Sequence, residues 1–140
     1  MKRSGSASWR GGLKDGQGTV STDSGALSRT SYNFAKRFEN EPGTNPEELV
    51  AAAHAACFSM FLSMVLGNEG MKADSIETKA TVTLEQVSGG FAVTSSHLET
   101  TAKIPNANKA AFEKATEAAK AGCPISKLLN AKITLDARLA

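Results

Sequence analysis

The spacing of hydrophobic and polar residues in the first forty positions predicts short strands joined by tight turns. Three segments with strand character lie around Ala7–Arg10, Gly18–Thr22 and Tyr32–Phe34. Glycine-containing pairs, which are typical of turns, separate them: Gly11-Gly12, Asp15-Gly16 and Ser24-Gly25. We therefore expect a β meander, with Arg37 at the end of its third strand.

A long helix is predicted from Asn45 to about Leu66. Asn45 suits the N-cap, Pro46 suits the first helical position, and Glu47 complements the positive end of the helix dipole. Alanine, methionine and phenylalanine fill most of the following positions, up to a stop at Gly67-Asn68. A helix that is apolar on nearly every side is expected to be central and covered on several sides.

The C-terminal half alternates with a period of two and then changes to a helical pattern. Ile76–Val87 and Phe91–Ile104 predict a long hairpin around Gly89-Gly90. Three further elements are expected, namely an amphipathic helix at Asn108–Ala121, a short helix at Pro124–Asn130 and a last strand at Ile133–Leu139. The order βββ-α-ββ-α-α-β is an α+β arrangement. Without repeats or a linker, residues 1–140 are expected to form a single domain.

Composition narrows the functional classes. The chain has 140 residues, of which 41% are hydrophobic and 21% charged, with a net charge of +2. The basic residues are scattered, so nucleic-acid binding is not expected. No apolar run follows the charged N-terminus, so a secretory signal is not expected. The apolar stretch Leu49–Leu66 is interrupted by His54 and Ser63 and is expected to be too short and too polar for a membrane span. We expect a cytoplasmic protein that does not bind a membrane.

The two cysteines lie in different settings. In a reducing compartment a permanent disulfide between Cys57 and Cys123 is not expected. Cys123 lies at the N-cap of the predicted short helix, where free N–H groups and the helix dipole favour a thiolate, so local physics makes it the more acidic thiol. Cys57 lies inside an apolar helix, where burial raises the pKa of a thiol. Cys57 is therefore either inert packing or a thiol that needs a nearby cation.

His54 and Arg37 are the candidates for that role. His54 precedes Cys57 by three residues and lies near the same helix face, either as a Cys–His pair for acyl transfer or as an ordinary helix histidine. Zinc binding by His54, Cys57 and Cys123 is a weaker hypothesis, and no metal is expected. Arg37, with apolar neighbours on both sides, is either an exposed charge or a guanidinium held beside a thiolate and fixed by a carboxylate.

Three blocks in order relate the chain to a known family. They are GTVSTDSG, RFENEPGTNPEELVAAAHAACFSM and KAGCPISKLLNAKITLDARL, with sixty-five residues between the two cysteines. From about Ser6 onward the chain resembles the OsmC/Ohr family of osmotically inducible protein C and organic hydroperoxide resistance proteins, and the OsmC branch in particular.

The resemblance implies a fold, an activity and a set of residues. It implies an intertwined homodimer with two central helices enclosed by β-sheets, and a cofactor-free thiol peroxidase for organic hydroperoxides, and less efficiently for hydrogen peroxide, in oxidative or osmotic stress defence. Cys57 would be the peroxidatic thiolate, Cys123 the resolving thiol, and Arg37 and Glu47 the activating pair. A dithiol, such as a lipoylated protein, would restore the enzyme. The Ohr branch carries its arginine near the position of Arg10, which is the alternative to Arg37.

The resemblance makes Cys57 the attacking thiol, whereas local physics favours Cys123. We expect Cys57 to attack, because a partner arginine can outweigh a helix-end dipole effect. Glu47 and Cys57 are ten positions apart, which is about 15 Å along one helix. A shared site therefore needs either a break near Pro46 or a Glu47 from a second subunit, and the apolar helix favours the second route. A non-catalytic dimeric binding protein and a Cys–His hydrolase stay open as alternative functions.

Overall fold

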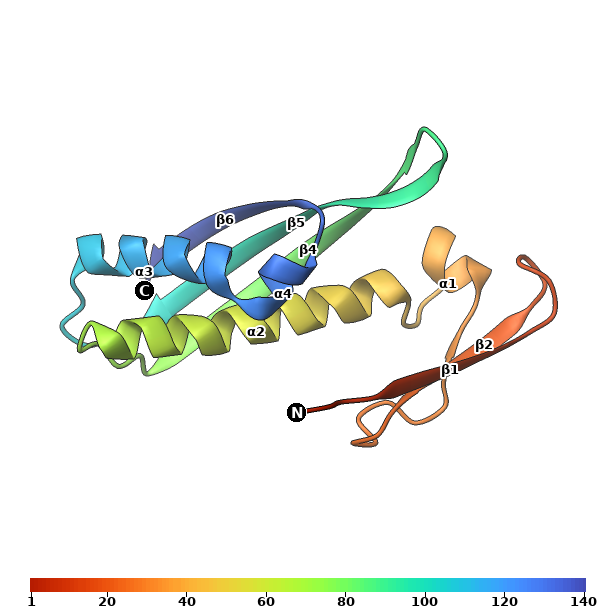
Figure 1. The fold of residues 1–140 in the computed structure, drawn as a ribbon, viewed down its shortest axis with the longest axis horizontal. Helices are drawn as coiled ribbons and strands as arrows, with labels where there is room; N and C mark the ends of the chain where they lie inside the picture. Colours follow the sequence, from red (N-terminus) through yellow and green to blue (C-terminus); the bar gives the residue numbers. More distant parts are fainter. The chain divides into compact units, whose positions relative to one another are not determined.

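The computed structural model describes all residues, 1–140, which form two compact units, Met1–Leu49 and Val50–Ala140. The fold is α+β, as expected (Figure 1). The elements of the first unit are β1 (Gly5–Arg10), β2 (Gln17–Thr22), β3 (Thr30–Tyr32), α1 (Phe34–Phe38) and the first turn of α2 (Pro46–Asn68).

The three N-terminal strands form an antiparallel sheet in the order β1-β2-β3. Gly18 of β2 pairs with Trp9 on one side and Tyr32 on the other, and the two aromatic rings lie 5.5 Å apart between centroids. A Cβ atom at Gly18 would lie 2.6 Å from the Trp9 ring and 2.7 Å from the Tyr32 ring. The glycine therefore makes room for an aromatic pair across the sheet.

The prediction for the end of the third strand is wrong. Strand β3 stops at Tyr32, and Arg37 lies in the short helix α1 rather than at a strand end. The cause is Asn33, whose side-chain oxygen accepts a hydrogen bond from the Lys36 N–H at 2.8 Å. An asparagine at this position caps the first turn of a helix and so competes with continuation of the strand.

Helix α2 begins as predicted and ends slightly later. The Asn45 side chain accepts a hydrogen bond from the Glu48 N–H at 2.8 Å, which caps the first turn. The helix continues through Gly67 and ends at Asn68, and Gly70, two residues later, has a φ of 73° that permits the reversal of a Schellman motif. The Met71 N–H accordingly reaches the Leu66 carbonyl at 2.9 Å.

The length of α2 corrects one expectation from the sequence. With 23 residues and few polar side chains, α2 has the length and composition of a membrane-crossing helix. The expectation that this stretch is too short and too polar is therefore wrong on those two criteria. Core helices of soluble proteins meet the same criteria, so this property alone assigns α2 to neither environment.

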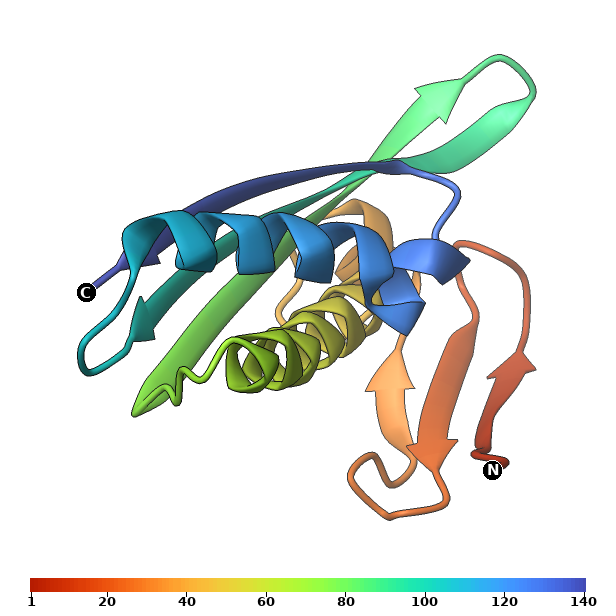
Figure 2. The same cartoon turned by 60° about the vertical axis from the view of Figure 1, so that its left-hand side comes forward.

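The second unit is a sheet covered on one face by helices. Its remaining elements are β4 (Ser75–Val87), β5 (Gly90–Lys103), α3 (Lys109–Gly122), α4 (Pro124–Leu128) and β6 (Lys132–Leu139). Strand β5 pairs antiparallel with β4 and parallel with β6, and α2 and α3 lie on the same face of this sheet (Figure 2). The turn between β4 and β5 falls at Gly89-Gly90, where both glycines have positive φ.

The hydrophobic core lies between that sheet and the two helices. Helix α2 contributes Phe58, Leu62 and Leu66, strand β5 contributes Leu98 and Ala102, and helix α3 contributes Phe112, Ala115 and Ala119. Every buried hydrophobic side chain of the protein belongs to the second unit. The N-terminal sheet therefore has no buried apolar core of its own.

Candidate active site

Cys57 and Cys123 come from different helices of the second unit. Cys57 lies on α2 and is partly buried, and Cys123 is fully buried between α3 and α4. Cys123 ends α3, where its N–H reaches the Ala119 carbonyl at 3.0 Å, and it is the N-cap of α4, where its sulfur accepts the Ser126 N–H at 3.4 Å. The predicted N-cap position of Cys123 is thus observed.

The fold brings the two thiols together. The Cys57 thiol lies close enough to the Cys123 side chain and to the backbone N–H of Ile125 for both groups to affect its pKa, and neither cysteine forms a disulfide. Burial is the main cause that raises the pKa of the Cys57 thiol, and the neighbouring Cys123 raises this pKa further, whereas the Ile125 N–H lowers it. The net direction is upward, so these surroundings within the chain disfavour a Cys57 thiolate.

Gly122 explains how the thiols approach each other. A Cβ atom at Gly122 would lie 3.1 Å from two carbons of the Phe61 ring, which is tighter than an ordinary contact. Phe61 follows Cys57 by one helical turn on α2. The absence of a side chain at Gly122 therefore lets the end of α3, and with it Cys123, pack closely against α2.

His54 is buried and does not pair with Cys57. Its Nδ1 lies 2.7 Å from Ser96 Oγ and its Nε2 lies 2.8 Å from Ser126 Oγ, so both ring nitrogens are occupied by hydroxyl groups. Burial lowers the pKa of His54. These contacts do not favour the Cys–His hydrolase. No group of three histidine, cysteine or acidic side chains is placed to hold a metal ion, so the zinc hypothesis gains no support.

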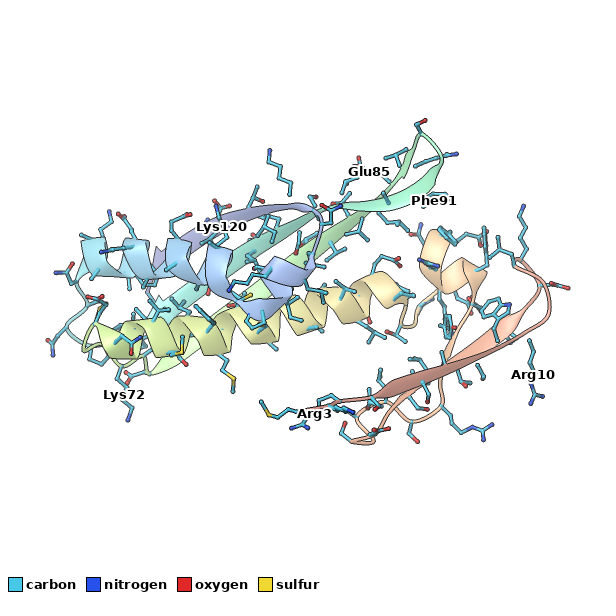
Figure 3. All side chains as sticks on the ribbon, viewed as in Figure 1. Arg3, Arg10, Lys72, Glu85, Phe91 and Lys120 are labelled. Carbon is cyan, nitrogen blue, oxygen red and sulfur yellow. The ribbon has the colours of Figure 1, made fainter.

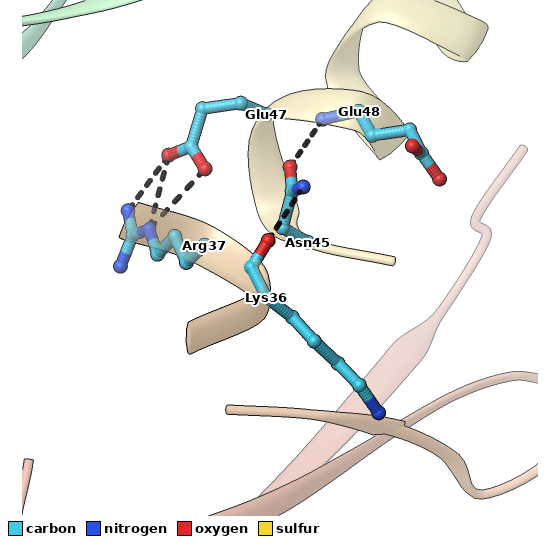
Figure 4. Close-up of polar contacts among 5 residues, drawn as sticks. All are labelled: Lys36, Arg37, Asn45, Glu47 and Glu48. Atoms are coloured by element: carbon cyan, nitrogen blue, oxygen red, sulfur yellow. Dashed lines mark hydrogen bonds and ion pairs between the residues drawn. The ribbon is translucent and has the colours of Figure 1, made fainter. Parts of the chain in front are cut away.

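Arg37 and Glu47 form an ion pair in the first unit (Figure 4). Arg37 Nη2 donates to Glu47 Oε1 at 2.8 Å, and Arg37 Nε lies 3.2 Å from both carboxylate oxygens. The Arg37 guanidinium also lies over the Phe38 ring, 5.2 Å from its centroid. Glu47 is only 13% exposed and Arg37 is 38% exposed, so the carboxylate fixes a guanidinium that still has an accessible side.

Asn45 joins the two elements that carry this pair. Its amide nitrogen donates to the Lys36 carbonyl of α1 at 3.2 Å, while its amide oxygen caps α2. Arg37 and Glu47 are thereby held at adjacent helix ends (Figure 4). Arg10, the alternative cation, lies on the exposed strand β1, and its side chain makes no hydrogen bond or ion pair (Figure 3). Of the two arginines, only Arg37 is fixed by a carboxylate.

A hollow beside Arg37 is lined mainly by apolar side chains. Its volume is about 290 Å³, and its lining residues are Trp9, Leu13, Tyr32, Asn33, Phe34, Arg37 and Phe38. The aromatic pair around Gly18 supplies two of these walls. The hollow has the size and polarity to accept a small apolar group next to a guanidinium.

Two polar residues in the cysteine region were not predicted from the sequence. Ser126 Oγ lies 3.1 Å from Cys123 Sγ as well as beside His54, and Ser96 contacts the opposite side of His54. Ser96 and Ser126 are 42 and 72 positions from His54. Serine is common and these contacts are long-range, so the sequence does not single out either residue. The one local indication is that Ser126 follows the N-cap residue Cys123 by three positions.

Sequence comparison identifies the family. The profile described as OsmC-like protein matches residues 38–138, and the chain belongs to this family. It is 50% identical over 139 residues to Peroxiredoxin OsmC of Escherichia coli K12, with 99% of this chain and 97% of that protein covered. It is also similar to organic hydroperoxide resistance protein OhrB of Bacillus subtilis, with 29% identity over 87% of this chain and 88% of that protein.

Solved structures show the same fold. The crystal structure of Bacillus subtilis OhrB covers 98% of both chains with a TM-score of 0.67 and 25% sequence identity. An OsmC-like protein of unknown function from Vibrio cholerae covers 98% of this chain and 99% of its own, with a TM-score of 0.77 at 17% identity. The OsmC-like fold expected from the sequence is therefore confirmed.

Proposed function

We propose that this protein is a thiol-dependent peroxidase that reduces organic hydroperoxides, and hydrogen peroxide less efficiently, in oxidative or osmotic stress defence. The peroxidase class is supported by the 50% identity to Peroxiredoxin OsmC over nearly the whole chain. The preference for organic peroxides is supported by the similarity to organic hydroperoxide resistance proteins and by the apolar hollow beside Arg37.

The observation that carries the proposal is the contact between Cys57 and Cys123. In the proposed reaction the Cys57 thiolate attacks the distal peroxide oxygen, the O–O bond breaks, and an alcohol leaves as Cys57 becomes a sulfenic acid. Cys123 then condenses with the sulfenic acid, which forms a disulfide and releases water. Two thiols that already lie close enough to affect each other's ionisation need little movement for this second step.

Arg37 and Glu47 are proposed to activate Cys57. Burial raises the pKa of Cys57, so the thiolate needs a positive charge that its own surroundings do not supply. The Arg37 guanidinium, oriented by Glu47, would stabilise the thiolate and the charge that develops on the leaving oxygen. Its planar fork can bind the carboxylate on one side and face the reacting atoms with the other.

We propose that this charge is supplied across a homodimer. Helix α2 has a buried stripe, His54-Phe58-Leu62-Leu66, and on its opposite face an exposed stripe that is just as apolar, Ala52-Ala56-Met60-Met64. Met60 is 77% exposed and Met64 is 51% exposed in the single chain. An uncovered apolar helix face and an N-terminal sheet without a buried core are both features that a second copy would cover.

The continuity of α2 supports the same arrangement. The helix begins at Pro46 and is unbroken, so Glu47 and Cys57 lie on one helix, about 15 Å apart along its axis. A helix break near Pro46, which could have brought Glu47 to the Cys57 of its own chain, is therefore absent. In the proposed dimer, the Arg37–Glu47 pair of one subunit activates Cys57 of its partner.

The reaction needs an external reductant and no cofactor. A dithiol, such as a lipoylated protein, would attack the Cys57–Cys123 disulfide and restore both thiols by exchange. The cytoplasm is the proposed compartment, because both cysteines are expected to be reduced there between turnovers.

Peroxide consumption with a dithiol reductant tests the proposal. With cumene hydroperoxide and dihydrolipoamide, Cys57→Ser is expected to abolish turnover, because the attacking sulfur is lost. Cys123→Ser is expected to leave one turnover and a sulfenic acid that dimedone traps on Cys57. If neither substitution alters peroxide consumption, the chemistry does not use these cysteines and a non-catalytic binding protein on this fold becomes the better account.

A further inference from the structure

Hydrogen-bonded side chains connect His54 to Cys123, the cysteine that lies beside Cys57. His54 comes from α2, Ser96 from β5 and Ser126 from α4, and all three side chains are buried. Ser126 Oγ lies 2.8 Å from His54 Nε2 and 3.1 Å from Cys123 Sγ. The imidazole is therefore joined to the Cys123 thiol through a single serine hydroxyl, and Cys57 lies close to that thiol.

The hydrogen bonds between Cys123, Ser126 and His54 can carry a proton from the thiol to the imidazole. A neutral imidazole has one donor and one acceptor nitrogen, and a serine hydroxyl has one proton to donate. When the Cys123 thiol donates to Ser126, the Ser126 hydroxyl can donate to His54 Nε2, and Nδ1–H then donates to Ser96. One step of proton transfer along these bonds gives a Cys123 thiolate that accepts the Ser126 O–H, with the proton held on His54.

The surroundings of His54 fit a group that exchanges a proton with this line. Only the hydroxyls of Ser96 and Ser126 bond to its ring, and no carboxylate or amino group does so. The imidazole is fully buried, and burial lowers its pKa, so it rests in the neutral form that can accept a proton. The Ser126 hydroxyl lies between the imidazole and the Cys123 thiol, which places a proton acceptor one hydroxyl away from the sulfur.

We propose that His54, acting through Ser126, is a positioning residue that orients the Cys123 thiol and receives its proton when Cys123 condenses with oxidised Cys57. This proposal rests on the peroxidase function proposed above. In the step, the Cys123 sulfur forms the S–S bond and is oxidised, while the Cys57 sulfur is reduced as its S–O bond breaks. The hydroxide that leaves takes up the proton that Cys123 lost, which returns from His54 through Ser126, so the products are a disulfide, water and a neutral imidazole, and no further oxidant is needed.

A single-turnover experiment on the full-length protein separates this step from the first one. Reduced protein is mixed with one equivalent of cumene hydroperoxide, and quenched samples are assayed by mass spectrometry for dimedone-trapped sulfenic acid and for disulfide. His54→Gln can form hydrogen bonds but cannot accept a proton, and Ser126→Ala removes the link. We expect peroxide attack to stay within about twofold of wild type in both variants. Disulfide formation should slow by about a hundredfold or more, the lower end of the range for lost proton transfer.

His97 provides the matched control. It is the other histidine of the chain, and its Nδ1 also bonds to a hydroxyl, Thr134 Oγ1 at 2.6 Å, but that hydroxyl is not bonded to a cysteine. His97→Gln is expected to leave both steps unchanged. Ser126→Thr keeps a hydroxyl and is expected to recover much of the rate lost in Ser126→Ala.

The pH dependence distinguishes proton transfer from mere misplacement of Cys123. In His54→Gln the thiol must ionise without the imidazole, so disulfide formation should rise close to tenfold per pH unit between about pH 6 and pH 8, more steeply than in wild type. A rate lowered equally at all pH values, a wild-type rate of disulfide formation, or an equal slowing of peroxide attack would overturn the proposal. A wild-type protein that consumes no peroxide and forms neither sulfenic acid nor disulfide would refute the peroxidase function itself.

Discussion

At the scale of single residues, Cys57 is a thiol whose own surroundings work against its ionisation. Burial and the adjacent Cys123 raise its pKa, and one backbone N–H is the opposing influence. Each unit by which a pKa is lowered requires about 1.4 kcal/mol of preferential stabilisation of the anion. A guanidinium held by a carboxylate, as Arg37 is, can supply interactions of that size where water is excluded.

The buried His54 leads to a prediction about stability and pH. Burial lowers its pKa in the folded state, so as the pH falls the unfolded chain binds a proton before the folded protein does. Above the ordinary histidine pKa of about 6.5, the contribution of His54 to the free energy of unfolding should be complete. At lower pH the free energy of unfolding should decrease by up to about 1.4 kcal/mol per pH unit. Urea unfolding between neutral and mildly acidic pH measures this slope.

His54→Gln is the matching variant, and it should have a smaller slope of stability against pH over that range. His97→Gln should retain the wild-type slope. Equal slopes in wild type and His54→Gln would show that His54 does not control the acid sensitivity of the fold.

At the scale of elements, Gly18 is a position where a side chain cannot be accommodated without movement. A Cβ atom there would lie within 2.8 Å of ring carbons of both Trp9 and Tyr32. Gly18→Ala should therefore destabilise the protein by about 1–3 kcal/mol, the usual range for overpacking. It should also raise the KM for cumene hydroperoxide more than the KM for hydrogen peroxide, because the two rings line the hollow beside Arg37.

Gly5→Ala is the control, since a Cβ atom on that strand residue would lie 3.4 Å from its nearest neighbour, the Ser21 carbonyl oxygen, which is an ordinary contact. Urea unfolding and steady-state kinetics of the two variants provide the comparison. If Gly18→Ala matches Gly5→Ala in stability and in both KM values, the aromatic pair does not shape a substrate site.

Most elements could be predicted from the sequence because their signals are local. Asn45-Pro46 marks the start of α2, alternation defines the β4–β5 hairpin, and Gly122-Cys123-Pro124 separates two helices. The short helix α1 was missed because its capping residue, Asn33, directly follows a strand. The hydroxyls around His54 were not predictable, since side-chain contacts between residues 42 and 72 positions apart depend on packing that no local pattern encodes.

At the scale of the whole molecule, the exposed apolar stripe of α2 predicts that a charge there prevents assembly. Met60→Glu should give a monomer in analytical ultracentrifugation, because a carboxylate would be buried without a partner in the proposed interface. Peroxidase turnover should fall by more than about tenfold, since one subunit would no longer supply Arg37 to the other.

Ala118→Glu is the control for this variant. Ala118 is exposed on α3, beside the charged residues Glu117 and Lys114, so the substitution should preserve both the dimer and its activity. A Met60→Glu monomer with full turnover would show that each chain contains a complete site.

In the proposed dimer the Arg37 guanidinium lowers the pKa of Cys57, and titration of that thiol measures this effect. In Cys123→Ser, Cys57 is the only thiol, and its thiolate can be followed by ultraviolet absorbance as the pH is raised. We expect a pKa well below the ordinary value of about 8.5, and a rise of at least about one unit when Arg37→Ala is added. A Cys57 pKa at or above the ordinary value in the intact dimer, unchanged by Arg37→Ala, would contradict the account.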